Sequence, residues 1–161
     1  MYSGEIVDFA TLDADTQELI RESVTAREKS YSPYSKFKVG AAVRCADGSI
    51  SRGCNVENAS FSATVCAETT AIVRAVSEGK KKFTALSVVA DQENKFTTPC
   101  GVCRQVISEF GDNIPIYLTR SDMKQVLRTR MSELFPFSPF DTSDTETSLS
   151  ISIFGSDARS S

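Results

Sequence analysis

Hydrophobic residues recur along this chain with two periods, and the change from one period to the other separates expected helices from expected strands. Apolar positions at helical spacing, preceded by acidic residues, predict a first helix over residues 16–29. Residues 37–45 and 49–56 are instead two β-rich runs. Asp47-Gly48 joins these runs, and this dipeptide is a strong hairpin signal. The two runs are therefore expected to pair as antiparallel strands.

The second half of the chain alternates between helix and strand. Helical periodicity covers residues 65–77 and residues 100–110. Short, continuously apolar runs at residues 86–90 and 114–118 are typical of buried strands, and residues 131–134 are expected to form a short helix. This order predicts an α/β protein in which helices pack on a mixed sheet.

A change of composition near residue 141 marks the end of the expected domain. The 161 residues are enough for one compact domain with its own core, to which we assign residues 1–140. Residues 141–161 are dominated by Ser, Thr, Asp and Glu and are expected to be largely disordered. Within them, the alternation at residues 150–154 is compatible with an added edge strand.

Charge and composition favour a small-molecule substrate. The net charge is −3, the pI is about 5.1, and the basic runs are short, so binding of a long polyanion is not expected. The chain has neither a signal-peptide pattern at its start nor an apolar run long enough for a membrane span. We therefore expect an intracellular, cytoplasmic protein whose thiols stay reduced. Cys45 and Cys54 lie in apolar strand-like runs and are assigned to packing.

The remaining three cysteines and a glutamate are the candidate site. They occur in Cys66-Ala67-Glu68 and in the Cys-x-x-Cys pair Cys100 and Cys103, and the chain contains no histidine. A zinc site must therefore use thiolates or carboxylates, and three thiolates leave a fourth position for the water that a hydrolytic zinc needs. The pattern favours catalytic zinc, but a redox pair at a helix start or a structural zinc site stays open.

The sequence around these residues resembles the small cytidine deaminases that act on free nucleosides. The resemblance runs from about residue 31 to residue 136, and the segments that carry it are residues 32–35, 37–42, 53–59, 64–68 and 99–105. It implies a three-layer α/β/α sandwich with a mixed five-stranded sheet. It also implies pyrimidine salvage by a homotetramer whose sites are shared between subunits.

The resemblance assigns a role to each candidate residue. Cys66, Cys100 and Cys103 would hold one zinc ion per subunit, and Glu68 would act as the proton shuttle and not as a ligand. The reaction implied is hydrolytic deamination of cytidine and deoxycytidine, with release of ammonia.

Substrate contacts are implied in the same way. Asn55 and Glu57 would hold the ribose hydroxyls, although both side chains also suit the capping of a turn. Phe37 would lie against the pyrimidine ring, although it also suits the core. Backbone groups that orient the base are expected at Thr64, Ala67 and Pro99.

The chain departs from the family pattern at two places. Many relatives have arginine where this chain has Thr69, so the negative charge of three thiolates needs another donor, and Arg104 or the Thr69 hydroxyl is the candidate. A late phenylalanine that reaches a neighbouring subunit's substrate does not align without a shift. We assign that role to Phe140 in preference to Phe137.

Two alternatives accompany this reading. One is deamination of another cytosine-containing nucleoside such as blasticidin S, and the other is a catalytically weak zinc-binding or redox paralogue. Relatives that act on deoxycytidylate or polynucleotides usually have a histidine ligand, which this chain lacks, so polynucleotide binding is not expected.

Overall fold

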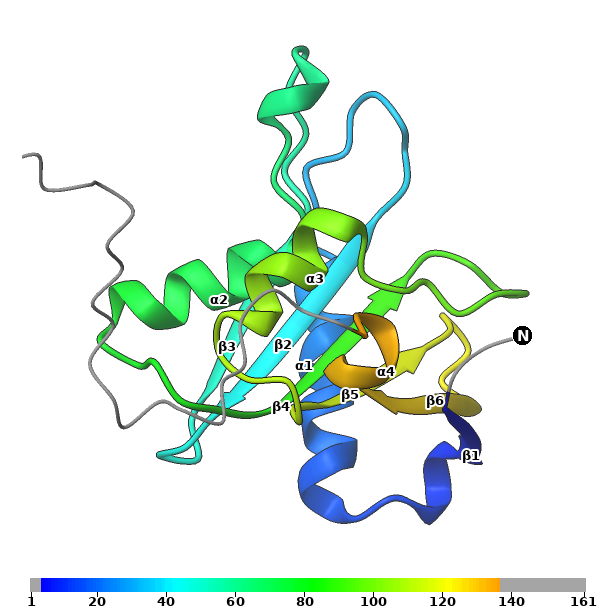
Figure 1. The fold of residues 1–161 in the computed structure, drawn as a ribbon. Coiled ribbons are helices and arrows are strands. Elements are labelled where there is room, and N and C mark those ends of the chain that lie inside the picture. Colours follow the sequence, from blue (N-terminus) through cyan, green and yellow to red (C-terminus); the bar gives the residue numbers. More distant parts are fainter. Residues whose placement is uncertain (1–3, 137–161) are drawn as a thin grey trace, which may run out of the picture.

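The protein is an α/β/α sandwich built on one mixed sheet (Figure 1). The computed structural model describes residues 4–136. The expected three-layer arrangement is confirmed, but the described sheet has six strands, in the order β1-β6-β5-β4-β2-β3, and not five. The strands are β1 (Glu5–Asp8), β2 (Val39–Cys45), β3 (Ile50–Cys54), β4 (Phe83–Ala90), β5 (Pro115–Thr119) and β6 (Gln125–Arg130).

Two of the six strands were not predicted, because each becomes a strand only by pairing. β1 has just four residues, three of them exposed, and β6 carries exposed arginines at two positions. The two strands pair antiparallel with each other although more than 100 residues separate them. The expected tail and its edge strand at residues 150–154 lie outside the described residues.

The helices follow the predicted pattern with small shifts at their ends. They are α1 (Ala14–Arg27), α2 (Ala67–Ser77), α3 (Gly101–Ser108) and the short α4 (Met131–Leu134), with 3-10 turns η1 (Phe9–Thr11) and η2 (Phe61–Ala63). α1 begins two residues before the prediction because Asp13 caps it by accepting a hydrogen bond from the Thr16 amide at 2.9 Å. β4 and β5 are parallel, and α3 lies in the connection between them.

Two glycines let helices lie very close to the sheet, one on each face. A Cβ atom at Gly40 would come within 2.1 Å of the Ser23 carbonyl oxygen in α1. A Cβ atom at Gly53 would come within 2.3 Å of the Ala71 amide nitrogen in α2. Since real Cβ atoms do not approach that closely, only glycine allows these contacts. The two contacts therefore fix the distances of α1 from β2 and of α2 from β3.

The core fills the space between the sheet and the α2–α3 layer. Its members include the buried aliphatic side chains of β4, β5 and the inner face of α2, such as Leu86, Val88, Ile116, Leu118 and Ile72. Cys45 is buried in the same cluster, as expected, whereas Cys54 is half-buried and its thiol donates to the Lys29 carbonyl at 3.3 Å. Among residues 4–136, no helix combines the length and the apolar character that crossing a membrane requires.

Candidate active site

The starts of α2 and α3 bring three cysteines together. Cys66 is the N-cap residue of α2, which begins two residues after the predicted start at residue 65, and Cys100 is the N-cap residue of α3. Cys103 follows in the first turn of α3 and is buried. The three sulfur atoms all lie within 4.8 Å of one another. Two helix N-termini therefore direct their positive dipole ends toward one group of thiols, which stabilises thiolate charge.

The spacing of the sulfurs fits a tetrahedral metal. The Sγ atoms of Cys66 and Cys100 are 3.8 Å apart. Two thiolates that each lie about 2.3 Å from a tetrahedral zinc are separated by about 3.8 Å. All three cysteines are free thiols. The donor set and its spacing therefore fit zinc, with one coordination position left open.

Glu68 lies beside the cysteines, in the first turn of α2. Only 4% of the residue is exposed, and burial raises the pKa of its carboxyl group above the ordinary value. A raised pKa suits a group that must both accept and release a proton near neutral pH.

The thiols influence one another's protonation. A hydrogen bond from Cys103 is the main reason that the pKa of Cys66 falls to about 7. The same contact, followed by burial and the nearby Glu68 charge, raises the pKa of Cys103.

Thr69 and Arg104, the two candidates for balancing thiolate charge, lie differently. The Thr69 hydroxyl is 3.7 Å from the Cys103 sulfur and lowers the pKa of that thiol. The Arg104 guanidinium instead donates to two backbone carbonyls, those of Pro99 and Leu134, each at 2.8 Å. Thr69 therefore contacts a thiol directly, whereas Arg104 hydrogen-bonds to these two carbonyls and, at 3.5 Å, to the Thr98 hydroxyl oxygen.

Asn55 and Glu57 lie at the end of β3 and are both buried. The Asn55 amide oxygen accepts from the Val39 amide at 2.9 Å, and its nitrogen donates to the Phe37 carbonyl at 2.8 Å. The Glu57 carboxylate accepts three hydrogen bonds, from the hydroxyl and the amide of Ser35 and from the amide of Tyr34. The Ser35 hydroxyl is the main reason that the pKa of Glu57 is lowered. Both side chains therefore hold the loop that precedes β2.

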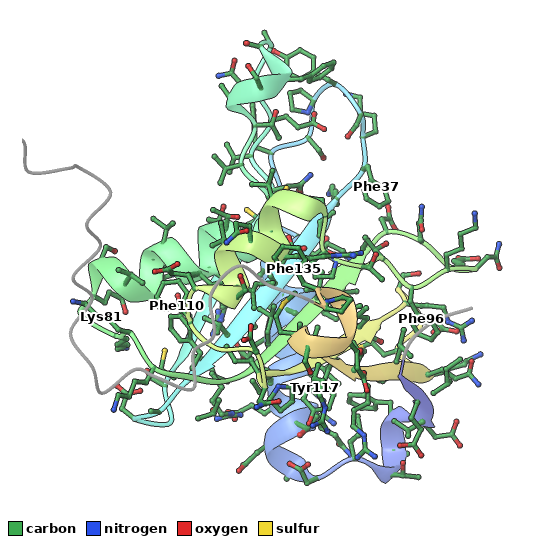
Figure 2. The ribbon with its side chains drawn as sticks, in the orientation of Figure 1. Phe37, Lys81, Phe96, Phe110, Tyr117 and Phe135 are labelled. Atoms are coloured by element: carbon green, nitrogen blue, oxygen red, sulfur yellow. The ribbon has the colours of Figure 1, made fainter. Side chains whose placement is uncertain are left out.

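That loop and the segment after β3 project together from the body of the molecule (Figure 1). We call residues 28–38 and 55–66 the arm. The two halves are joined by backbone hydrogen bonds, such as those between Tyr31 and its partners Asn55 and Glu57. Phe37 is half-buried and lies where the arm enters β2 (Figure 2). Phe140 lies outside the described residues.

The arm also has a feature that the sequence patterns did not indicate. Five of its large hydrophobic side chains are 40–70% exposed, and they are Tyr31, Tyr34, Val56, Phe61 and Val65. Tyr34 and Phe61 pack edge to face, with ring centroids 6.0 Å apart. Hydrophobic periodicity could not reveal this surface, because exposure is set by how the two loops fold together.

Comparison with known proteins gives the family. Residues 13–119 match the sequence model described as the cytidine and deoxycytidylate deaminase zinc-binding region. The chain belongs to this family. A cytidine deaminase from Sporosarcina psychrophila is 50% identical over 125 residues, which cover 76% of this chain and 89% of that protein. The crystal structure of a cytidine deaminase from Burkholderia pseudomallei superposes with a TM-score of 0.72 at 42% identity, covering 75% of this chain and 96% of that one.

Family membership also bears on the alternatives. A blasticidin-S deaminase from Bacillus cereus is 30% identical over 131 residues, which is less than the identity to the cytidine deaminases. The blasticidin S alternative is therefore not favoured. A redox module is not favoured either, because it would leave the third thiol and the buried glutamate of the family's zinc-binding region without a role.

Proposed function

We propose that this protein is a zinc-dependent enzyme that hydrolytically deaminates cytidine and deoxycytidine to uridine and deoxyuridine. The observation that carries the proposal is the group of three thiol sulfurs within 4.8 Å of one another, with the buried Glu68 beside them. Cys66, Cys100 and Cys103 would hold the zinc ion, one per subunit. The ion, when bound, would supply a water acidified enough to act as the nucleophile.

Glu68 then carries the protons of the reaction. Its carboxylate takes the proton from the attacking water and delivers it to N3 of cytosine, while oxygen adds to C4. The carboxylate next takes the proton of the hydroxyl group now on C4 and delivers it to the exocyclic amine, so that ammonia leaves and the uracil carbonyl forms. The buried position of Glu68 excludes bulk water from these transfers.

Glu57 and Asn55 are proposed to bind the ribose. The Glu57 carboxylate accepts three hydrogen bonds from the arm, and a carboxylate has about four acceptor sites, so one remains for a ribose hydroxyl. Asn55 uses one of its two amide hydrogens on the Phe37 carbonyl, which leaves the other for the sugar. Phe37 would pack on the pyrimidine ring, and backbone groups near Ala67 would orient the base.

We further propose that the enzyme is a cytoplasmic homotetramer that works in pyrimidine salvage. The exposed hydrophobic side chains of the arm support self-association, because a monomer rarely leaves such a group in water. Phe140 of a neighbouring subunit would complete each site. Sedimentation analysis of the wild type beside Phe61→Ser tests the association, and a tetramer that is lost or weakened in the variant is expected. A monomeric wild type would contradict this part of the proposal.

A substrate panel tests the proposed activity. Purified protein with quantified zinc is incubated with cytidine, deoxycytidine and blasticidin S, and the loss of ultraviolet absorbance and the released ammonia are measured. The proposal expects turnover of both pyrimidine nucleosides and little of blasticidin S. Zinc-loaded protein that converts neither nucleoside would overturn it, and preferential turnover of blasticidin S would favour the alternative deaminase.

A further inference from the structure

Arg104 ties together two backbone segments that are distant in the sequence. It lies in α3 directly after Cys103, and its Nε donates to the Pro99 carbonyl at 2.8 Å. Its Nη1 donates to the Leu134 carbonyl, also at 2.8 Å, and Nη2 lies 3.5 Å from the Thr98 hydroxyl oxygen. The guanidinium therefore spans from the residue before Cys100 to the last residue of α4.

The segment before Cys100 has few other anchors. Within residues 4–136, no backbone–backbone hydrogen bond joins residues 97–99 to the rest of the protein. Pro99 is buried, yet it has no amide hydrogen with which to form one. The two hydrogen bonds from Arg104 thus hold the turn that sets the direction of the exposed Cys100 side chain.

The second carbonyl that Arg104 binds, that of Leu134, belongs to α4. This helix has only four residues and packs against α3 (Figure 1). Phe135, which follows Leu134, packs against the hydrophobic core, so the Leu134 carbonyl is a fixed point for the guanidinium (Figure 2). Arginine presents its donors in a rigid planar fork, whereas the single ammonium of lysine cannot match two separate carbonyls in the same geometry.

We infer that Arg104 is a positioning residue that holds the Pro99–Cys100 turn against the end of α4, and so fixes Cys100 as a zinc ligand. This inference rests on the proposed function in one respect, namely that Cys100 binds zinc. It differs from a role in balancing thiolate charge. A charge-balancing residue can be replaced by lysine, and a residue that acts through its fork cannot.

The test compares zinc retention in Arg104→Lys, Arg104→Met and wild-type protein. Zinc-loaded samples are mixed with a chromogenic chelator, and the rate of zinc transfer is measured. Loss of groups that orient metal ligands typically weakens metal binding by about 10- to 100-fold, so both variants are expected to release zinc about tenfold faster or more. Arg74→Met is the matched control, because Arg74 is an exposed α2 arginine whose ion pair is with Glu78.

The spectrum of the cobalt(II)-substituted proteins gives a second readout. Its thiolate charge-transfer and d–d bands report ligand geometry directly, and a merely destabilised but folded protein would keep them. Both Arg104 variants are expected to show shifted bands, and Arg74→Met is expected to show the wild-type spectrum. If Arg104→Met does not fold, Arg104→Lys alone decides the question.

Two results would overturn the inference. Wild-type zinc release and bands in Arg104→Lys, with a defect only in Arg104→Met, would mean that charge and not positioning matters. Wild-type behaviour of both variants would mean that the hydrogen bonds do not hold the ligand. Failure of the proposed function is read separately, since zinc-loaded wild type that leaves cytidine unchanged would refute the activity while the release rates still decide the role of Arg104.

Discussion

Replacing Gly53 by alanine is expected to move helix α2. The new Cβ atom would lie 2.3 Å from the Ala71 amide nitrogen and 2.4 Å from the Ala67 carbonyl oxygen, both in α2. Neither atom belongs to a flexible side chain, so the helix or the strand has to shift by about 0.7 Å to restore a separation of about 3.0 Å. Ala67 stands between Cys66 and Glu68, so the shift reaches the proposed ligand and proton shuttle directly.

The expected cost appears in both stability and rate. Overpacking a close contact of this kind costs about 1–3 kcal/mol, which lowers the Tm by several degrees in a protein of this size. A misplacement of about 1 Å in an active site can lower the rate about 100-fold. Gly53→Ala should therefore lower kcat for cytidine by at least tenfold at a temperature where thermal scans show the protein folded.

Gly40→Ala is the matched control for this experiment. Its Cβ atom would meet α1 on the opposite face of the sheet, at 2.1 Å from the Ser23 carbonyl oxygen, so it should cost comparable stability. α1 carries none of the proposed site residues, and kcat of the folded variant should stay near the wild-type value. Equal kcat values for Gly53→Ala and wild type, or equal losses in both variants, would refute the argument that this contact positions the site.

Three further substitutions have defined outcomes. Asp13→Ala removes the α1 cap and should lower the free energy of unfolding at pH 7 by about 1 kcal/mol. Hydrogen bonds lower the pKa of Asp13, so its stabilising contribution is present above the unfolded pKa of about 3.9 and is lost as the pH falls through the lower folded value. The difference in unfolding free energy between wild type and Asp13→Ala, measured by denaturant curves, should therefore be smaller at pH 3 than at pH 7. Ser35→Ala should raise the pKa of Glu57 and the KM for cytidine, with a smaller change in kcat; an unaltered KM would contradict the proposed ribose contact. Thr69→Arg should raise kcat and move the acidic limb of the pH–rate profile to lower pH if the thiolate charge is undercompensated, and an unchanged profile would show that the Thr69 hydroxyl suffices.

The parts of the fold that sequence predicted are those with strong local signals. The hairpin of β2 and β3 followed from two β-rich runs around Asp47-Gly48, and Gly48 has the positive φ of 84° that such a turn requires. α2 and α3 followed from their apolar spacing. The contact between Cys66 and Cys100, 34 residues apart, followed from the family resemblance and not from any local pattern.

The parts that escaped prediction depend on distant contacts. β1 and β6 are short and partly polar, and neither sequence indicates that the two strands pair with each other. The hydrogen bonds of Arg104 to two backbone carbonyls likewise have no signal in the sequence, which indicates only the positive charge of the residue. Side chains whose role lies in joining remote segments need the folded geometry before they can be assigned.

Zinc content and cytidine turnover, measured on the same samples of wild type, Glu68→Gln and Cys103→Ser, separate metal binding from proton transfer. One zinc per chain and turnover are expected in the wild type, one zinc per chain without turnover in Glu68→Gln, and loss of both in Cys103→Ser. Glu68→Gln that still deaminates cytidine, or that loses its zinc, would contradict the central claim that three thiolates bind the metal while Glu68 only moves protons.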